Sequence, residues 1–537
     1  MTKYVFVTGG VLSGVGKGVT TASIAMLFQS MGYNTTIIKI DPYLNVDAGT
    51  MNPYAHGEVF VTEDGGETDL DIGHYERFLN KDLSKKNNIT AGQIYYAVIM
   101  KERRGEYLGA TVQIIPHVTN EIKQKIRDVG KEYNADMVFV EIGGTVGDIE
   151  SLPFLEAARQ MKLEEGFNNV AFIHVALVPT LKTTGEQKTK PVQHSVQELR
   201  RIGIQPDIIV ARCEKPLNDE AKAKIALFSN VPPEAVISNH DVNNIYEVPI
   251  ILMHQNIHKI LAAKLSLNYV EPNISPWLSF LEKLSKATQS IRIAMIGKYT
   301  KLRDSYISIV EAIKHASAYE GVKPVFKWIE STDIENGYVD ISKELEDVDG
   351  AIILPGFGKR GAEGKIKAVQ LLRENNVPTL GLCFGFQLMV VEIARNVAGL
   401  ANANSTELDP STPYPVIDLL PSQREIDFLG GSMRLGAIKI KLFKNRKVYE
   451  AYGKEIISER HRHRYGVNIK YIDRIESTGF VISGVSLDNE NVIEFMELRN
   501  NFLFIGTQAH PEFKSRPLTP SPIYHYFISK IASKIRK

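Results

Sequence analysis

Continuous apolar runs alternate with helical patterns along the first half of the chain. Strands are predicted at residues 4–8, 35–40, 137–142, 170–178 and 207–211. Most of these runs are apolar at every position, which is typical of parallel strands covered on both faces. A helical pattern at residues 17–31 ends at Gly32, a residue that commonly caps helices. The pattern predicts an α/β fold with a doubly wound, mostly parallel sheet.

A second series of strands is predicted in the other half of the chain. Its members are residues 292–296, 350–354, 377–380 and 502–506. Between the two series, residues 268–276 contain two prolines and few periodic positions. We therefore expect two doubly wound domains, residues 1–267 and 291–537, joined by a linker at 268–290. Residues 402–424, with four prolines and many polar side chains, are expected to form a surface loop or insertion.

Composition excludes several classes of function. The 537 residues carry a formal net charge of +1, which gives no overall attraction for nucleic acid or an anionic membrane. The two cysteines, Cys213 and Cys383, cannot build a disulfide framework and fit a reducing compartment. No apolar run is long enough to span a bilayer. We expect a cytoplasmic protein with neither nucleic-acid nor membrane partners.

The most informative short segment is residues 381–387, Gly-Leu-Cys-Phe-Gly-Phe-Gln. A strand ends at Gly381, and a helical pattern follows Cys383, so the thiol lies on a sharp turn at a helix N-terminus. Far downstream, His510 and Glu512 follow another strand and offer a base with a carboxylate to orient it. A lone cysteine is most often a packed core residue. The glycines on both sides and the later His-Pro-Glu favour a nucleophile instead.

A glycine-rich segment follows the first strand directly. Residues 9–21 contain five glycines and Lys17 before a helix, which predicts a phosphate-binding loop. The segment departs from the strict Walker pattern, because one extra residue precedes Gly16-Lys17 and Gly18 replaces the usual Ser or Thr. Backbone N–H groups, the helix dipole and Lys17 can still hold phosphate.

Two acidic residues are candidates to hold Mg²⁺ near that loop. Glu141 ends an apolar strand, and Asp71 lies in an acidic segment, residues 67–77. Residues 188–196, in which Lys188 and Lys190 precede a helical pattern, could hold a second polyphosphate. Taken alone, that segment is better explained as a charged helix entrance.

The chain resembles the CTP synthase family over essentially its whole length. The likeness rests on residues 7–18, 39–43, 56–65, 141–153, 188–196 and 460–465. The second half is also similar to the class I glutamine amidotransferases through Cys383 and the His510–Glu512 segment. The resemblance implies a ligase in which ATP phosphorylates O4 of UTP and ammonia from L-glutamine displaces the phosphate, giving CTP. It also implies Mg²⁺, stimulation by GTP, inhibition by CTP and a homotetramer.

The resemblance assigns roles position by position. Cys383 is implied as the nucleophile, His510 as its base and Glu512 as the residue that orients the base. ATP contacts are implied for Ser13, Gly14, Val15, Gly16, Lys17, Gly18, Val19, Lys39 and Asp71. UTP or CTP contacts are implied for Ser13, Asp148, Ile149, Glu150, Lys188, Thr189, Lys190, Pro191, Val192, Gln193 and Lys224. Glutamine contacts are implied for Gly356, Phe384, Gly385, Phe386, Gln387, Glu407 and Arg464. Mg²⁺ ligation is implied for Asp71 and Glu141.

The sequence departs from the family pattern at one place, and two alternative functions compete with this assignment. Many members of the family have two glycines before the phenylalanine of the oxyanion loop, whereas here Gly356 alone precedes Phe357. A different ATP-dependent amidotransferase that activates a carboxylate could share the two domains, but residues 188–196 and the separated acids argue against it. An assembly protein that has lost its chemistry is opposed by the complete set of candidate catalytic residues.

Overall fold

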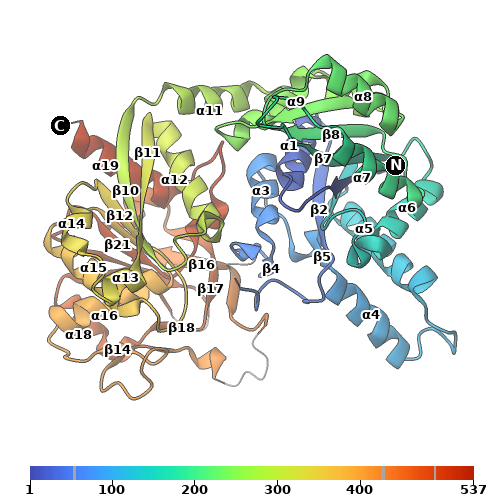
Figure 1. Cartoon of the computed structure of the whole chain (residues 1–537). Helices are drawn as coiled ribbons and strands as arrows, with labels where there is room; N and C mark the ends of the chain where they lie inside the picture. Colours follow the sequence, from blue (N-terminus) through green and yellow to red (C-terminus); the bar gives the residue numbers. More distant parts are fainter. Residues whose placement is uncertain (53–55, 425–429, 489–491, 537) are drawn as a thin grey trace. The chain divides into compact units, whose positions relative to one another are not determined.

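The structure of the chain divides into two compact units (Figure 1). It is a computed structural model and describes residues 1–52, 56–424, 430–488 and 492–536. The first unit contains Met1–Ala48 and Asp71–Leu281, and the second contains Gly49–Leu70 and Glu282–Lys537. Within the described residues, no helix combines the length and the apolar character needed to cross a membrane.

The first unit is built on a seven-stranded sheet in which every pairing is parallel. Across the sheet the strands are β5 (Asn88–Thr90), β2 (Thr35–Asp41), β6 (Met137–Ile142), β1 (Lys3–Gly10), β7 (Val170–Val178), β8 (Ile208–Cys213) and β9 (Val236–His240). Strands β2 and β6 are buried at every position, as expected for covered parallel strands, although β2 carries Lys39 and Asp41 and β6 carries Glu141. The five predicted strands are all present.

Helices cover both faces of this sheet. They are α1 (Lys17–Ser30), α3 (Leu70–Leu79), α4 (Ala91–Arg103), α5 (Thr119–Glu132), α6 (Leu152–Glu165), α7 (Lys190–Arg201), α8 (Asp219–Ser229), α9 (Val248–His254) and α10 (Ile257–Lys264). Phe6 and Ile38 pack with α5 and α6 in one apolar core, whereas α1 contacts β1, β2 and β6 together with α9 and α10. The prediction of a doubly wound α/β fold is confirmed.

The second unit contains a nine-stranded sheet of mixed direction. Its order is β11 (Val322–Glu330), β10 (Gln289–Gly297), β12 (Gly350–Ile353), β13 (Thr379–Leu382), β21 (Phe504–Thr507), β20 (Ile493–Leu498), β19 (Phe480–Ser486), β16 (Arg434–Leu442) and β17 (Ile456–His463). The first five strands in this order, from β11 across to β21, pair in parallel, and they include the four predicted strands. From β21 onward the pairings are antiparallel.

Adjacent residues of β12 show how the second sheet is covered. Ile352 belongs to a core with α12 (Ile307–Glu320) and α19 (Pro522–Ile535), and Ile353 belongs to a core with α15 (Ala362–Glu374) and α16 (Phe384–Asn396). Successive side chains of a strand point to opposite faces, so the sheet has a helical layer on each side. The shorter helices of the second unit are α13 (Ser331–Glu335), α14 (Ile341–Leu345), α17 (Lys447–Tyr452) and α18 (Ile472–Glu476). Helix α11 (Ser275–Lys286) contains the boundary between the two units, because its residues 275–281 belong to the first.

The prediction of a surface loop at residues 402–424 is wrong in part. Strands β14 (Asn404–Ser405) and β15 (Pro415–Leu419) form a three-stranded sheet with β18 (Tyr465–Val467). Val416 and Ile417 are fully buried in this sheet. Their burial depends on a partner strand some fifty residues away, which local composition does not reveal.

Residues 49–70 belong to the second unit although they lie early in the chain. They carry the hairpin of β3 (Phe60–Val61) and β4 (Glu67–Thr68). Glu63 accepts from the fully buried Arg460 at 2.9 Å, and Glu67 accepts from Arg462 at 2.8 Å. The Ala437 N–H also donates to the Glu63 carbonyl at 2.9 Å. The predicted boundaries at 267 and 291 did not anticipate this assignment, and they stay a prediction.

The close approach at Gly436 provides a test of this packing. A Cβ there would lie 2.7 Å from the Gly65 nitrogen, whereas a Cβ at Gly453 would meet nothing within 4 Å. Both residues have positive φ, 84° and 63°, so alanine is strained at each to a similar degree. We expect Gly436→Ala to destabilise the protein by about 1–3 kcal/mol more than Gly453→Ala, because of overpacking. Calorimetric unfolding of both variants measures this, and equal effects would contradict the described packing.

Candidate functional site

Cys383 occupies a sharp turn between β13 and α16. Its φ is 51° and its ψ −107°, a conformation that a residue with a side chain rarely adopts. The Cys383 N–H donates to the Thr507 carbonyl of β21 at 2.7 Å, which ties the turn to the neighbouring strand. The thiol lies 3.6 Å from the Arg462 carbonyl and accepts from the Gln508 side-chain amide at 3.6 Å. The turn predicted from the sequence is present, with its sulfur at the start of a helix.

The glycines on either side of Cys383 are required by close packing. A Cβ at Gly385 would overlap with the Ile353 carbonyl of β12, and one at Gly381 would overlap with the Met389 side chain. Because the Ile353 carbonyl is backbone, it cannot move aside cheaply. The first turn of α16 is therefore pressed against the sheet, and this holds Cys383 in place.

His510 and Glu512 complete a chain of hydrogen bonds beside Cys383. His510 Nδ1 lies 2.7 Å from Glu512 Oε1, and the Tyr524 hydroxyl donates to Glu512 Oε2 at 3.3 Å. The backbone N–H of His510 donates to the Arg460 carbonyl at 2.8 Å, and the imidazole ring stacks on the ring of Phe513. This arrangement leaves Nε2 of the ring to serve the thiol, as a nucleophile–base–carboxylate triad requires.

The electrostatics of the triad favour a charged imidazole. Burial lowers the pKa of His510, but the Glu512 carboxylate and Cys383 outweigh it and raise the pKa to about 10. An imidazolium next to the sulfur stabilises a thiolate, the form of cysteine that attacks carbonyl carbon.

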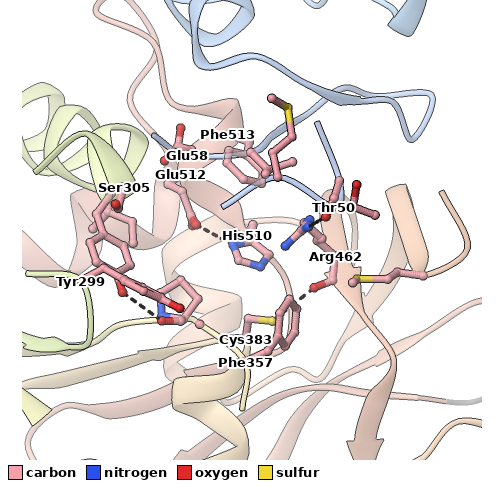
Figure 2. A pocket seen from close by; sticks show the side chains of 18 residues that line it. Thr50, Glu58, Tyr299, Ser305, Phe357, Cys383, Arg462, His510, Glu512 and Phe513 are labelled. Atoms are coloured by element: carbon pink, nitrogen blue, oxygen red, sulfur yellow. Dashed lines mark hydrogen bonds and ion pairs between the residues drawn. The ribbon is translucent and has the colours of Figure 1, made fainter. Parts of the chain in front are cut away.

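A cavity of about 270 Å³ opens over the triad (Figure 2). Its lining includes Cys383, His510, Gly356, Tyr299 and Arg462. Residues 49–51, Glu58 and Val59, from the segment that joins the second unit early in the chain, also line it. Sites for small molecules usually range from about 300 to 1,000 Å³, so the cavity is near the lower end of that range, a size that suits an amino acid.

The loop after β12 brings Gly356 and Glu407 to the same region. Gly356 has a φ of 121°, which favours glycine. The Gly358 N–H donates to Glu407 Oε1 at 2.7 Å. Glu407 Oε2 is buried and has no hydrogen-bond partner among the described residues. Burial raises the pKa of Glu407, although the Gly358 N–H opposes this. A buried carboxylate oxygen of this kind suits a ligand with a positive charge, but Glu407 is not among the residues that line the described cavity over the triad.

The other residues predicted to contact glutamine lie outside the described cavity. Phe384, Gly385 and Phe386 form the buried first turn of α16. Gln387 is buried, and its amide donates to the Tyr465 carbonyl at 2.8 Å and to Gln508 Oε1 at 3.1 Å. The Arg464 guanidinium donates to Gln423 Oε1 at 3.0 Å and Ser432 Oγ at 2.7 Å. Neither Gln387 nor Arg464 lines the described cavity.

Arg462 is a pocket residue that the sequence analysis missed. Its guanidinium lies over the Phe357 ring, 5.6 Å from the centroid, and donates to the Gly49 carbonyl at 2.9 Å. Strand β17 alternates its side chains, so Arg460 and Arg462 face residues 49–70, and His461 faces Glu494 instead. The alternation of arginine and histidine at 460–464 was a usable signal for a strand with two polar faces.

In the first unit, the predicted phosphate loop gathers two lysines and two acids. Lys17 begins α1 after Gly16, and its Nζ donates to the Gly144 carbonyl at 2.9 Å. Lys39 Nζ lies 3.1 Å from Glu141 Oε1 and also contacts Asp71 Oδ2. A Cβ at Gly18 would overlap with Asp71 Oδ1, so the glycine that departs from the Walker pattern makes room for a carboxylate. The structure brings together Lys17, Lys39, Asp71 and Glu141.

The donor set at this place suits Mg²⁺. Burial raises the pKa of Glu141, and it lowers the pKa of Lys17. Burial also acts to raise the pKa of Asp71, but Lys39 outweighs it, so the net pKa is lowered. Two hard carboxylates beside a phosphate-binding loop are the ligands that Mg²⁺ takes in phosphoryl-transfer sites. The described residues contain no group of three or more acidic, histidine or cysteine ligands, so substrate oxygens and water would have to supply the rest.

A separate basic pocket of about 290 Å³ lies at the start of α7. Its lining includes Lys188, Thr189, Lys190, Gln193 and Lys224, so the structure brings together residues that the resemblance assigned to UTP or CTP. Glu186 and Glu220 line it as well and pair with Lys188 and Lys224, each at 2.6 Å. Pro191 and Val192 belong to the first turn of α7. Asp148, Ile149 and Glu150 are exposed and do not line this pocket, and Ser13 is exposed on the phosphate loop.

His174 is another residue that the sequence analysis missed. Fully buried on β7, it bridges Thr8 Oγ1 and Ser195 Oγ, each at 2.8 Å. Burial lowers the pKa of His174 to about 3, so the ring is neutral and serves as a hydrogen-bond link. It joins the strand before the phosphate loop to the helix that begins the basic pocket. A single histidine within an apolar run carries no signal that separates this role from simple packing.

The raised pKa of His510 predicts a pH-dependent stability. The ordinary pKa of histidine is about 6.5, so the stabilisation is fully present below that pH and is lost as pH rises through about 10. We expect the thermal midpoint of the wild-type protein to exceed that of His510→Gln by a margin that shrinks between pH 6 and pH 10. In a Glu512→Gln background, which lacks the carboxylate, the margin should change much less. A margin that is constant with pH in the wild-type background would contradict a charged His510.

Two family models match the chain. The model described as CTP synthase N-terminus matches residues 3–267, and the model described as glutamine amidotransferase class-I matches residues 301–530. Among solved structures, the glutaminase domain of a Trypanosoma brucei CTPS with bound acivicin is 33% identical. It covers 45% of this chain and 94% of that chain with a TM-score of 0.43.

Curated relatives match over the full length. A CTP synthase of Aeropyrum pernix is 61% identical over 532 residues, which are 99% of this chain and 98% of that protein. A CTP synthase of Pyrococcus furiosus is 59% identical over 525 residues, which are 98% of this chain and 97% of that protein. With this identity over both units, the chain belongs to the CTP synthase family.

Proposed function

We propose that the chain forms CTP from UTP in an ATP-dependent amination, with ammonia released from L-glutamine at Cys383. The observation that carries the proposal is the Cys383 turn beside the 2.7 Å His510–Glu512 contact, in a chain 61% identical to a CTP synthase over 99% of its length. The phosphate loop and basic pocket of the first unit supply the other half of the reaction.

The glutaminase steps follow from the groups around Cys383. The thiolate attacks the side-chain carboxamide carbon of glutamine, and the Gly356 N–H stabilises the oxyanion. His510 gives its proton to the departing ammonia, which leaves a glutamyl thioester on Cys383. His510 then takes a proton from water, and hydroxide attack releases glutamate and restores the thiolate. Glu407, whose Oε2 has no partner among the described residues, holds the ammonium group of glutamine.

The amination steps take place in the first unit. The uracil O4 is a poor leaving group, so ATP must phosphorylate it first. Ammonia then attacks carbon 4 and phosphate leaves, which gives CTP, ADP and phosphate. Lys17 and Lys39 provide positive charge for the transferred phosphoryl group, and the glycine loop provides backbone N–H groups. The lysines of the basic pocket hold the triphosphate of UTP or of the inhibitor CTP.

The proposal includes the nucleotide partners and the metal. Bound Mg²⁺ would neutralise phosphate charge, and Asp71 and Glu141 are the residues that would hold it. GTP is proposed as an activator of the glutaminase and CTP as an inhibitor, both from the family resemblance. The homotetramer is proposed on the same basis. The cytoplasmic location stays a prediction.

Cys383→Ala should separate the two nitrogen sources. Removal of the thiol abolishes glutamine-dependent CTP formation, and ammonia-dependent formation stays near the wild-type rate because the first unit is untouched. Assays with UTP, ATP and Mg²⁺, with either glutamine or ammonium chloride, measure this. Cys213→Ala, the other buried cysteine, is the matched control and should keep both activities. Loss of ammonia-dependent synthesis in Cys383→Ala would overturn the division of labour.

Glu141→Gln should remove CTP formation from either nitrogen source. The amide preserves the size of the buried side chain but removes the charge that Lys39 contacts at 3.1 Å and that a metal would need. We expect a decrease of at least about 100-fold, since metal and lysine positioning supply most of the stabilisation in phosphoryl transfer. Glu132→Gln, in an exposed ion pair with Lys86, is the control. Full ammonia-dependent activity of Glu141→Gln would show that the metal assignment is wrong.

A further inference from the structure

A lysine without an evident role lies behind the oxyanion loop. Lys365, in the first turns of α15, is 1% exposed. Its Nζ donates to the Leu354 carbonyl at 2.7 Å and to the Pro355 carbonyl at 3.3 Å. Within the described parts of the chain, Lys365 forms no salt bridge with a carboxylate. A buried ammonium bound only to backbone carbonyls is costly, which indicates that something is gained from its position.

The buried position of Lys365 allows it to hold the peptide group between Pro355 and Gly356. This group contains the Pro355 carbonyl and the Gly356 N–H, which point in opposite directions because the peptide is planar and trans. Whatever holds the carbonyl therefore also fixes the direction of the N–H. Lys365 Nζ donates to that carbonyl at 3.3 Å. The Tyr306 hydroxyl lies at the same distance from it, but the single proton of this hydroxyl is directed mainly to the Lys298 carbonyl at 2.5 Å.

The loop needs such support because Gly356 is intrinsically free to rotate. Its φ of 121° lies where glycine alone is comfortable. Only one glycine precedes Phe357 here, so this single peptide group must take the required orientation. A donor on the carbonyl also polarises the peptide and strengthens the N–H as a donor.

Helix α15 holds Lys365 rigidly in place. A Cβ at Gly364 would overlap with the Ser331 carbonyl, so this turn of α15 lies directly on α13. The Lys365 ammonium also lies over the Phe384 ring, 5.2 Å from the centroid, and Phe384 follows Cys383 in the chain. Lys365 thus contacts the oxyanion loop and the turn that carries the nucleophile.

We propose that Lys365 is a positioning residue for glutamine hydrolysis, which orients the Gly356 N–H toward the oxyanion through the Pro355 carbonyl. The inference rests on the proposed role of Cys383 and Gly356 in that reaction. Lys365 does not touch the substrate, and its effect is confined to the transition state. Binding of glutamine in the ground state does not require it.

Lys365→Met tests the proposal, because methionine keeps the length of the side chain and removes the donor. We expect kcat for glutamine hydrolysis to fall about 10- to 100-fold, less than the 10²–10³ typical of deleting an oxyanion donor outright. KM for glutamine should stay within about threefold, and ammonia-dependent CTP formation should be unchanged. Lys367→Met, an exposed lysine two residues along α15, is the matched control and should keep the wild-type kcat.

Two further variants distinguish positioning from a merely structural role. Lys365→Gln keeps a donor with a shorter reach and should recover part of the lost kcat. Tyr306→Phe removes a hydroxyl that donates mainly to the Lys298 carbonyl and only weakly to the Pro355 carbonyl, so kcat should fall less in this variant than in Lys365→Met. If Lys365→Met does not fold, Lys365→Gln decides, and its kcat must fall at unchanged KM.

The outcomes are separable from those of the proposed function. An unchanged kcat in Lys365→Met, or a loss of kcat together with a large rise in KM and a loss of ammonia-dependent synthesis, overturns the positioning role. If the wild-type protein itself makes CTP from ammonium but not from glutamine, the proposed role of Cys383 fails instead.

Discussion

The backbone of Cys383 is the constraint on which the catalytic arrangement depends. A residue held at a φ of 51° and a ψ of −107° carries strain of order 1–3 kcal/mol. It persists because Gly385 lies against the Ile353 carbonyl and because the N–H of Cys383 is bound to Thr507. Thr507 ends the strand that leads to His510, so the parallel pair β13 and β21 places the nucleophile and its base together. Without that pairing, two residues far apart in sequence would not meet.

The parallel strands and the catalytic residues were predictable because their signals are local. A covered strand is apolar at most positions, as β7 is, and a nucleophile turn needs glycines at fixed offsets. The antiparallel strands β16, β17, β19 and β20 were not found, because charged, polar or glycine residues interrupt their apolar positions. The strand β15 was taken for a loop because prolines surround it, although Val416 and Ile417 are buried in the core that includes α16.

The candidate reacting groups of the site were predictable from the sequence. The residues that hold those groups in position were not. Cys383, His510 and Glu512 carry the chemistry in their side chains, and a motif records them. Lys365 and His174 work through backbone carbonyls and hydroxyls contributed by other elements. A lysine on a helix and a histidine in a strand are common, so neither is distinguishable until the fold shows what lies next to it. Arg464 is the opposite case, a residue that the motif assigns to glutamine. In this structure its guanidinium donates to Gln423 and Ser432.

Residues 49–70 show that order along the chain and membership of a compact unit are separate properties. A reader of the sequence would place Glu63 and Glu67 with the nucleotide-binding half, yet their carboxylates pair with the buried Arg460 and the half-buried Arg462 beside the glutaminase cavity. A substitution in residues 49–70 would therefore be expected from its position to impair nucleotide binding, but it would impair glutamine hydrolysis instead. The same continuity means that a cut through the linker near residue 281 does not yield two intact enzymes. The glutaminase would lose one wall of its pocket and the counter-ions of two arginines.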